Sequence, residues 1–356
     1  MMKKLQRELL KKLFLAMMVL VSLCITPAFA VKVASLYQVE IPVASQAADA
    51  RAQAIQDGFL RVLIKVSGDP HVDQNPDVRA SLKSADYYVQ EYSYLLPSTS
   101  SSEYILLIRY NKRDVNTLLK RSGVAYWGEN RPLILVWLAV SNGQEPTEIV
   151  DNDTPNGVLN VMKQQGKKYG LPLIFPMMDV SDVNQVTPAD VSAMTLPVLK
   201  EAGKRYSPDA LLIGNLKQGD GGCESTWQLV LGGTQWNWKV TGKSPDEVVN
   251  NVLNLVSQTF VKRYVVKAAN GTRSWFKLEV SNITERNDLV QLIQYLKQLS
   301  PVQQVQLSQV SGNMVELAVQ VRGSLTTFQQ NASIGQRMVL KSQDQTNNKL
   351  IYEWTH

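Results

Sequence analysis

The alternation of hydrophobic and polar positions along this chain predicts strands and helices that follow one another in three successive stretches. The first stretch, residues 31–128, has the order β-α-β-β-α. Its predicted elements are strands over residues 31–41, 87–96 and 104–110, a long helix between a cap at Ser45 and a stop at Gly68, and a helix over residues 114–121. The long helix is predicted from apolar positions that recur every three or four residues: Ala48, Ala52, Ile55, Phe59, Val62 and Val66.

The second stretch, residues 129–268, opens with a run of nine apolar or proline residues over 132–140. A continuous run of this kind is typical of a strand that is buried on both faces of a sheet. Further elements alternate behind it: helices over residues 158–169 and 196–206, and strands over residues 171–176 and 209–216. Strands that alternate with helices indicate a layered α/β arrangement.

A β-hairpin is predicted around Gly232-Gly233, because two glycines suit the tight turns that join antiparallel strands. Pairing across this turn places Trp227 opposite Trp238 and Leu229 opposite Trp236, on one face of the hairpin. That face is either a binding platform for carbohydrate or peptide, or a core face under the next helix. We favour the core face, because Ser244 and Pro245 predict the start of a long amphipathic helix directly afterwards.

The third stretch, residues 272–356, follows a polar junction at Asn270-Gly271. Its predicted elements are strands over residues 275–281, 302–310, 314–321, 337–341 and 350–354, a helix over residues 288–299, and a short helix that Ser324 caps. This order suggests a ferredoxin-like β-α-β-β-α-β sandwich. The predicted fold class is therefore α/β (α+β), in several small layered domains of which the last is ferredoxin-like.

The amino-terminal residues predict a signal peptide over residues 1–30. Five basic residues lie among the first twelve, and residues 13–31 carry no charge. The apolar run over 13–25 is shorter than the roughly 20 residues of a membrane span, and it ends at Ala28-Phe29-Ala30. Cleavage between Ala30 and Val31 would release the chain into the periplasm of a Gram-negative bacterium; an uncleaved anchor is the alternative.

Cleavage of the predicted signal peptide would change the net charge of the chain. The leader holds five basic residues and one acidic residue, so totals of 37 and 31 become 32 and 30, and the net charge falls from +6 to +2. A chain this close to neutral lacks the basic field that nucleic acids require, so we expect no nucleic-acid partner. Cys24 leaves with the leader, and Cys223 is then the single cysteine, without a partner for an internal disulfide.

The chemistry that the sequence offers is limited to carboxylates. His71 and His356 are the two histidines, and no metal-binding, nucleotide-binding or nucleophile motif is present, so we expect no cofactor and no metal. Asp179, Asp182 and Asp190 are candidates for a cleft together with Arg131. Asp190 has a second interpretation, as an early-helix charge after Pro188 that the helix dipole favours.

Several stretches resemble an exported bacterial family known as domain of unknown function 2066. They cover residues 35–265 and include Val62–Gly68, Tyr88–Tyr92, Trp127–Pro132 with Trp137–Ala139, Leu171–Leu173 with Pro176 and Asp179, and Arg205-Tyr206 with Asp209–Gly214. The resemblance implies export and supplies no activity. A fainter likeness of residues 210–238 to periplasmic accessory proteins, which are binding modules, is an analogy of fold alone.

These observations together predict an exported envelope protein that binds other envelope components, either proteins or cell-wall material, through small α/β domains. After cleavage of the leader we expect no stable membrane span. The alternative is a hydrolase that acts on cell-wall or glycan material through Asp179, Asp182 or Asp190.

Overall fold

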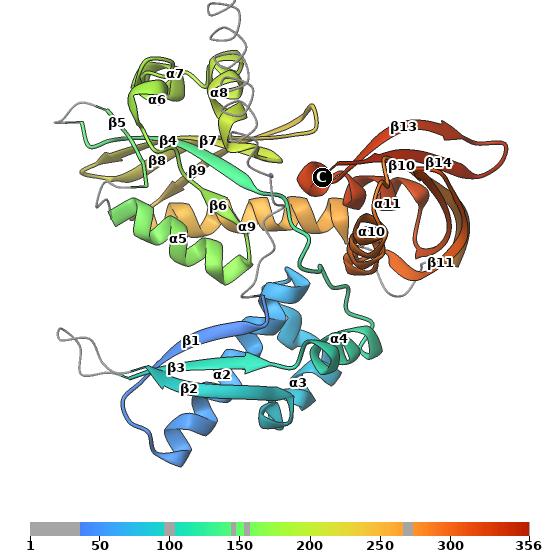
Figure 1. The fold of residues 1–356 in the computed structure, drawn as a ribbon. Helices are drawn as coiled ribbons and strands as arrows, with labels where there is room; N and C mark the ends of the chain where they lie inside the picture. The colour runs from blue at the N-terminus through green and yellow to red at the C-terminus, as the bar shows by residue number, and fades with distance from the viewer. Residues whose placement is uncertain (1–35, 96–103, 144–146, 153–156, 266–272, 356) are drawn as a thin grey trace, which may run out of the picture. The chain divides into compact units, whose positions relative to one another are not determined.

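A computed structural model describes residues 36–95, 104–143, 147–152, 157–265 and 273–355. These residues belong to one compact unit that spans Ala30–Thr355. The predicted signal peptide and its cleavage site at Ala30 and Val31 lie outside the described residues. The mixed α/β class is confirmed, since three sheets of antiparallel or mixed strands alternate with helices (Figure 1).

The first sheet is antiparallel, in the order β1-β3-β2. Its elements are β1 (Gln38–Val43), α2 (Ala48–Ser67), α3 (Pro76–Leu82), β2 (Val89–Leu95), β3 (Tyr104–Tyr110) and α4 (Lys112–Arg121), with the 3-10 helices η1 (Val72–Gln74) and η2 (Ala85–Tyr88). Helix α2 covers one face, and Ile55, Phe59 and Val62 are buried there as the periodicity predicts.

The predicted end of α2 at Gly68 is confirmed, whereas the predicted cap at Ser45 is wrong. Gly68 ends the helix in the left-handed conformation, with φ of 71°, which a residue without Cβ adopts freely. Ser45 does not cap it: the N-cap is Ala47, which offers no side-chain acceptor, and the Ser45 hydroxyl accepts a hydrogen bond from the Ala47 amide at 3.4 Å. Ala48 and Ala52, which the periodicity places on the buried face, are exposed.

The second sheet has the order β5-β4-β7-β8-β9, and β6 also pairs with β4. Its strands are β4 (Ile134–Ser141), β5 (Glu148–Ile149), β6 (Leu173–Ile174), β7 (Ala210–Gly219), β8 (Gly222–Leu231) and β9 (Thr234–Gly242). Its helices are α5 (Gly157–Tyr169), α6 (Val180–Val183), α7 (Pro188–Ser192), α8 (Leu196–Gly203), η3 (Lys204–Tyr206) and α9 (Pro245–Tyr264). Strands β6 and β7 run parallel to β4, and the other pairs are antiparallel.

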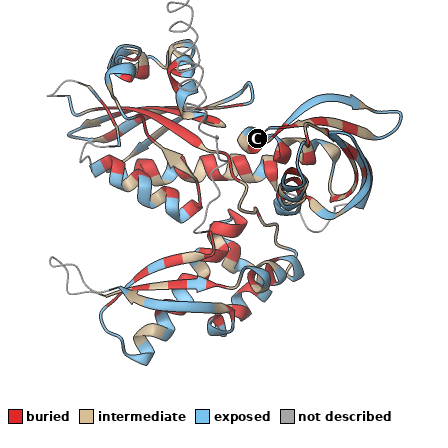
Figure 2. Cartoon of the chain, viewed as in Figure 1, coloured by how far each residue is buried: buried red, intermediate tan, exposed pale blue. Residues whose placement is uncertain are grey.

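Strand β4 is buried on both faces, as its continuous apolar sequence predicts. Ile134, Val136 and Leu138 belong to the core under α5 and α9, whereas Leu135, Trp137 and Ala139 belong to the core under α7 and α8. The helices of the two layers lie on opposite faces of this sheet (Figure 1), and the central strands are the most continuously buried segments (Figure 2).

The predicted hairpin register is confirmed: Trp227 pairs with Trp238, Leu229 with Trp236, and Leu231 with Thr234. Gly232 and Gly233 both have positive φ, 53° and 84°, as the primed turns require. The tryptophan face packs on the core that α9 completes, with Trp227 fully buried and Trp236 and Trp238 partly buried. Helix α9 begins as predicted, since the Ser244 hydroxyl accepts a hydrogen bond from the Glu247 amide at 3.3 Å.

The third sheet has the order β11-β12-β10-β14-β13. Its elements are β10 (Arg273–Ser281), α10 (Arg286–Gln298), β11 (Val302–Ser311), β12 (Met314–Arg322), α11 (Leu325–Ala332), η4 (Ile334–Gln336), β13 (Met338–Asp344) and β14 (Lys349–Trp354). The split β-α-β half of a ferredoxin-like unit is present, since β10 and β11 both run antiparallel to the β12 strand between them. The second half has one strand more: β13 forms the edge and returns as β14, which therefore runs parallel to β10.

The described residues form four hydrophobic cores: one on the first sheet, one on each face of the second sheet, and one on the third sheet. Ile334, which follows α11, belongs to the core of the second sheet under α5 and α9. The Asn331 side chain also donates a hydrogen bond to the Tyr264 carbonyl at 3.1 Å. The division at residues 268–272 is therefore crossed by core contacts, and independent folding of residues 272–356 stays a prediction.

Candidate functional site

Two of the predicted acidic residues, Asp179 and Asp182, lie together at the start of α6. Asp179 is the N-cap of this short helix, and its Oδ1 accepts hydrogen bonds from the amides of Ser181 and Asp182, both at 3.1 Å. Asp182 is fully buried, and its Oδ2 accepts a hydrogen bond from the Met178 amide at 3.1 Å. Both carboxylates thus stabilise the loop that follows β6 by accepting hydrogen bonds from its backbone amides.

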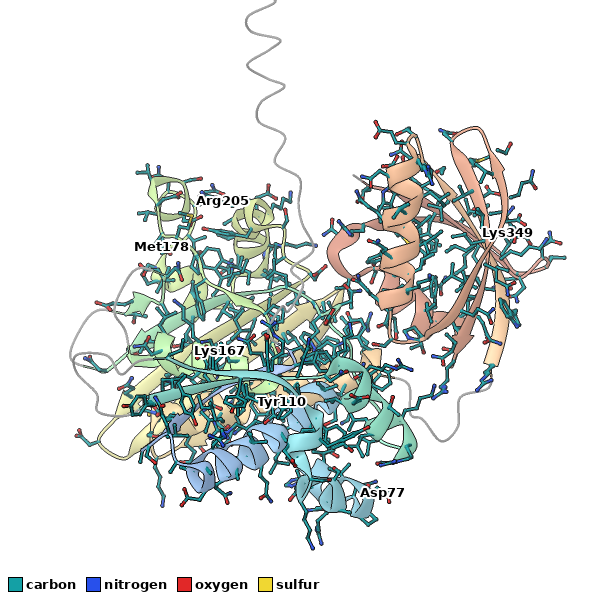
Figure 3. The ribbon with its side chains drawn as sticks, turned by 60° about the horizontal axis from the view of Figure 1, so that its bottom comes forward. Asp77, Tyr110, Lys167, Met178, Arg205 and Lys349 are labelled. Atoms are coloured by element: carbon teal, nitrogen blue, oxygen red, sulfur yellow. The ribbon has the colours of Figure 1, made fainter. Side chains whose placement is uncertain are left out.

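Arg205 and Tyr206, from η3, complete this cluster. The Arg205 guanidinium donates two hydrogen bonds of 2.7 Å to the two oxygens of Asp179, and a third of 3.2 Å to Oδ1 of Asp182. The Tyr206 hydroxyl donates to Oδ2 of Asp182 and accepts from the Met177 amide at 2.9 Å. We call Asp179, Asp182, Arg205 and Tyr206 the α6 clamp. Figure 3 labels Met178 and Arg205 in this part of the chain.

The electrostatics of the α6 clamp follow from these contacts. Hydrogen bonds from Arg205 and from backbone amides lower the pKa of Asp179 to about 2. Desolvation, and then the hydrogen bond to Asp182, raise the pKa of Tyr206 to about 12. At neutral pH the tyrosine is therefore a hydrogen-bond donor, the Asp179 carboxylate is charged, and the clamp is held by charge-assisted hydrogen bonds.

Asp190 does not share the clamp's hydrogen bonds. It forms a capping box with Thr187 at the start of α7: its Oδ2 accepts from the Thr187 amide at 2.9 Å, and the Asp190 amide donates to the Thr187 hydroxyl at 3.2 Å. Hydrogen bonds from Thr187 lower the pKa of the Asp190 carboxyl. This geometry agrees with the second interpretation of Asp190, as an early-helix charge.

The hydrogen bonds of Arg131 in the described structure go to backbone carbonyl oxygens and not to the three aspartates, so the structure does not bring Arg131 into their cluster. Its side chain is buried and donates to the carbonyl oxygens of five residues at 2.7–3.1 Å: Lys65, Trp127, Gly128, Tyr169 and Gly170. The guanidinium also lies 4.2 Å from the centroid of the Trp127 ring. Burial lowers the pKa of Arg131 to about 9. The guanidinium therefore stays charged at neutral pH. Arg131 therefore joins its own segment, residues 127–131, to Lys65 and to residues 169–170, and is a structural residue.

An exposed apolar patch lies on the loop that the α6 clamp holds. Met177, Val180 and Val183 are 54%, 79% and 56% exposed. The backbone between them is constrained, since Met178 has a left-handed φ of 49° and its amide is bound by Asp182. We call Met177, Val180 and Val183 the α6 patch. The patch was not predicted from the sequence. Its signal there is that Val180 and Val183 directly follow Asp179 and Asp182, around a helix of four residues that is too short to bury both valines.

The described residues also bear on metal binding, thiol chemistry and membrane spans. Within those ranges, no group of three or more His, Cys, Asp or Glu side chains comes together as a metal site would require. Cys223 is buried, and desolvation raises the pKa of its thiol. In the same ranges, no helix has the length and the apolar character that crossing a bilayer demands.

Comparisons with known proteins give families without an assigned activity. Residues 277–354 match the family model DUF2066, and residues 30–128 match a second model, described as Domain of unknown function (DUF8605). No curated protein matches the chain. The predicted family is thus confirmed, but its model lies on the third sheet and not on residues 35–265.

Two solved structures are similar at a low level. One is described as the crystal structure of an uncharacterized protein; it has 10% identity and a TM-score of 0.16, and the match covers 37% of this chain and 91% of that one. The other is selenomethionine-substituted allophanate hydrolase from Kluyveromyces lactis, with 11% identity, a TM-score of 0.15, and coverage of 74% and 63%. Neither score indicates a shared fold. Over residues 277–354, this chain matches the model of the DUF2066 family.

Proposed function

We infer that this chain is an exported envelope protein that binds another envelope protein through the α6 patch and catalyses no reaction there. The observation that carries the proposal is the combination of exposure and order at Met177, Val180 and Val183. Three large apolar side chains in water are unfavourable unless another surface covers them. A loop that is fixed beforehand loses little conformational entropy when a partner binds.

The chemistry around the α6 patch supports a protein partner. The Arg205–Asp179 ion pair is about one-third exposed and gives the apolar residues a charged neighbour on the same loop. An apolar centre with polar groups at its rim is the usual composition of a protein interface. The expected partner surface is therefore apolar at its centre, with hydrogen-bonding groups around it.

The hydrolase alternative requires a carboxyl group that is free to exchange a proton with substrate. A general acid needs a pKa near the working pH, whereas Asp179 has a pKa of about 2 and is paired with Arg205. Asp182 is buried beneath three donors, and Asp190 caps α7. These roles account for all three side chains as loop and helix supports, which favours the binding proposal.

The test is a crosslinking pulldown from intact cells with three forms of the full chain. Val180→Lys places a charge at the centre of the patch and, because Val180 is 79% exposed, should leave the fold unchanged. Val339→Lys is the matched control, since Val339 is an exposed valine on β13. The proposal predicts a crosslinked species that Val180→Lys loses and Val339→Lys keeps. Retention of that species in both variants contradicts it.

The alternative has its own measurement, the release of soluble fragments from purified cell-wall or glycan material. If the unaltered protein releases fragments and a folded Asp182→Asn variant does not, the hydrolase is correct and the binding proposal is wrong. Circular dichroism of the variant establishes that it is folded.

Export forms part of the proposal and rests on the sequence of residues 1–31. The intact mass of the protein from a periplasmic fraction should correspond to a chain that begins at Val31. A full-length species that requires detergent would show an uncleaved anchor.

A further inference from the structure

Strand β11 is an unprotected edge of the third sheet. It pairs with β12 on one side and is the end of the strand order among the described residues (Figure 1). Its ten residues include no charge and no proline. Natural edge strands usually carry such residues, because exposed amide and carbonyl groups otherwise recruit another strand.

The other edge strands longer than two residues carry this protection. The protecting residues are Glu40 and Pro42 in β1, Glu91 in β2, Lys239 in β9, and Lys341 and Asp344 in β13. Strand β11 has two bulges against β12, but residues 304–307 between them keep a regular register. The absence of charge in β11 therefore sets it apart within the described structure.

The two faces of β11 differ in polarity. Val302, Val305, Leu307 and Val310 pair with the buried residues Val321, Val319, Leu317 and Val315, and so lie on the face that α10 covers. Leu307 and Val310 are nevertheless 48% and 55% exposed, since β11 is the last strand of this sheet in the described part of the chain. Gln304, Gln306 and Gln309 occupy the open face and are exposed.

The sequence of β11 is nearly symmetric about Gln306. In both directions from this residue the order is apolar, polar, polar, apolar: Val305 and Leu307, Gln304 and Ser308, Gln303 and Gln309, Val302 and Val310. Residues directly opposite in an antiparallel pair lie on the same face of the sheet. Two copies of β11 in this register would match valine with valine and valine with leucine on the helix face, and glutamine with glutamine at the centre.

We propose that this chain associates with a second copy of itself by antiparallel pairing of β11 with β11 about a two-fold axis at Gln306. The pairing joins two five-stranded sheets into one continuous sheet. It satisfies the open backbone groups of both edges, covers Leu307 and Val310, and brings no like charges together. A two-fold axis uses the same patch on both copies, which is the commonest form of homodimer. The dimer does not depend on the α6 patch.

The experiment measures the mass of the full chain by light scattering after size exclusion, over a range of concentrations. Gln306→Lys and Gln306→Glu each place two like charges opposite one another at the axis, and each should raise the dissociation constant by about a hundredfold. An equal mixture of the two variants should form a dimer again, because a cation then faces an anion. Gln90→Lys, the same change at an exposed position of edge strand β2, should leave the dimer intact.

Each outcome decides the proposal. Loss of the dimer in both single variants and recovery in the mixture support pairing at Gln306. A monomer for the unaltered chain at millimolar concentration, a dimer that survives both single variants, or a mixture that stays monomeric overturns it. Circular dichroism of each variant establishes that a lost dimer does not reflect unfolding.

Discussion

The indole ring of Trp227 in β8 lies directly against the Cα of Gly214 in β7. The two residues are opposite one another in the antiparallel pair. A Cβ built on Gly214 would lie 2.4 Å from the nearest ring carbon of Trp227, which is too close for two carbon atoms. Gly214 has an ordinary backbone conformation, so the glycine is required by the ring and not by a turn.

Gly214→Ala should destabilise the fold by about 1–3 kcal/mol, because a buried ring must move away from the added methyl group. Gly221→Ala is the control: no atom lies within 4 Å of a Cβ at Gly221, and the change should stay within about 0.5 kcal/mol. Urea unfolding of both variants measures the difference. Equal free energies of unfolding for the two variants would show that the Trp227 ring has room to move.

The tryptophans of the hairpin should differ in their contribution to stability. Trp227→Ala removes a fully buried ring and should cost about 3–5 kcal/mol, whereas Trp236→Ala removes a partly exposed ring and should cost less. Chemical unfolding of the two variants gives both values. A larger loss for Trp236→Ala would contradict the assignment of this face to the core that α9 covers.

Arg131→Lys should be strongly destabilising although it keeps the charge. Lysine has three donors in place of five, so carbonyl oxygens that Arg131 satisfies would lose their partners. The expected loss is about 2–5 kcal/mol, at about 1–3 kcal/mol for each unpaired buried group. Arg109→Lys is the control, since Arg109 forms an exposed ion pair with Glu91. A similar melting temperature for both variants would refute the structural role of Arg131.

Because the Lys65 side chain is buried, the free energy of unfolding should increase as the pH rises. Burial, and then repulsion from Arg131, lower the pKa of Lys65 to about 8, while the Nζ donates to the Gln38 carbonyl at 2.9 Å. The folded pKa lies below the unfolded value of 10.5, so the unfolded chain binds more protons between these two pH values. The free energy of unfolding therefore increases as pH rises through this window.

Denaturant unfolding between pH 8 and pH 9.5, before the tyrosines titrate, should show a gain of about 1–2 kcal/mol from Lys65. Lys65→Met should remove this gain, and Lys200→Met, at an exposed lysine, should keep it. A flat profile for the unaltered protein would show that Lys65 keeps an ordinary pKa.

Elements whose causes lie within a few residues of one another could be predicted from the sequence. The glycine pair at 232–233 set the hairpin register, Ser244 and Pro245 set the start of α9, and the apolar run of β4 predicted burial on both faces. In each case the turn, the cap or the run acts on its own neighbours along the chain. Such signals are present in one sequence without knowledge of the fold.

Which charged groups form pairs depends on the packing of distant segments and could not be predicted from the sequence. Asp179 and Asp182 were identified as neighbours, but their partner Arg205 lies 26 residues from Asp179, and Arg131 binds a carbonyl 66 residues away. The parallel pairing of β14 with β10 was decided in the same way, by the extra strand β13 that precedes it. Contacts at such separations depend on how the sheets and helices pack, because a side chain's partner is whatever the folded backbone brings within reach.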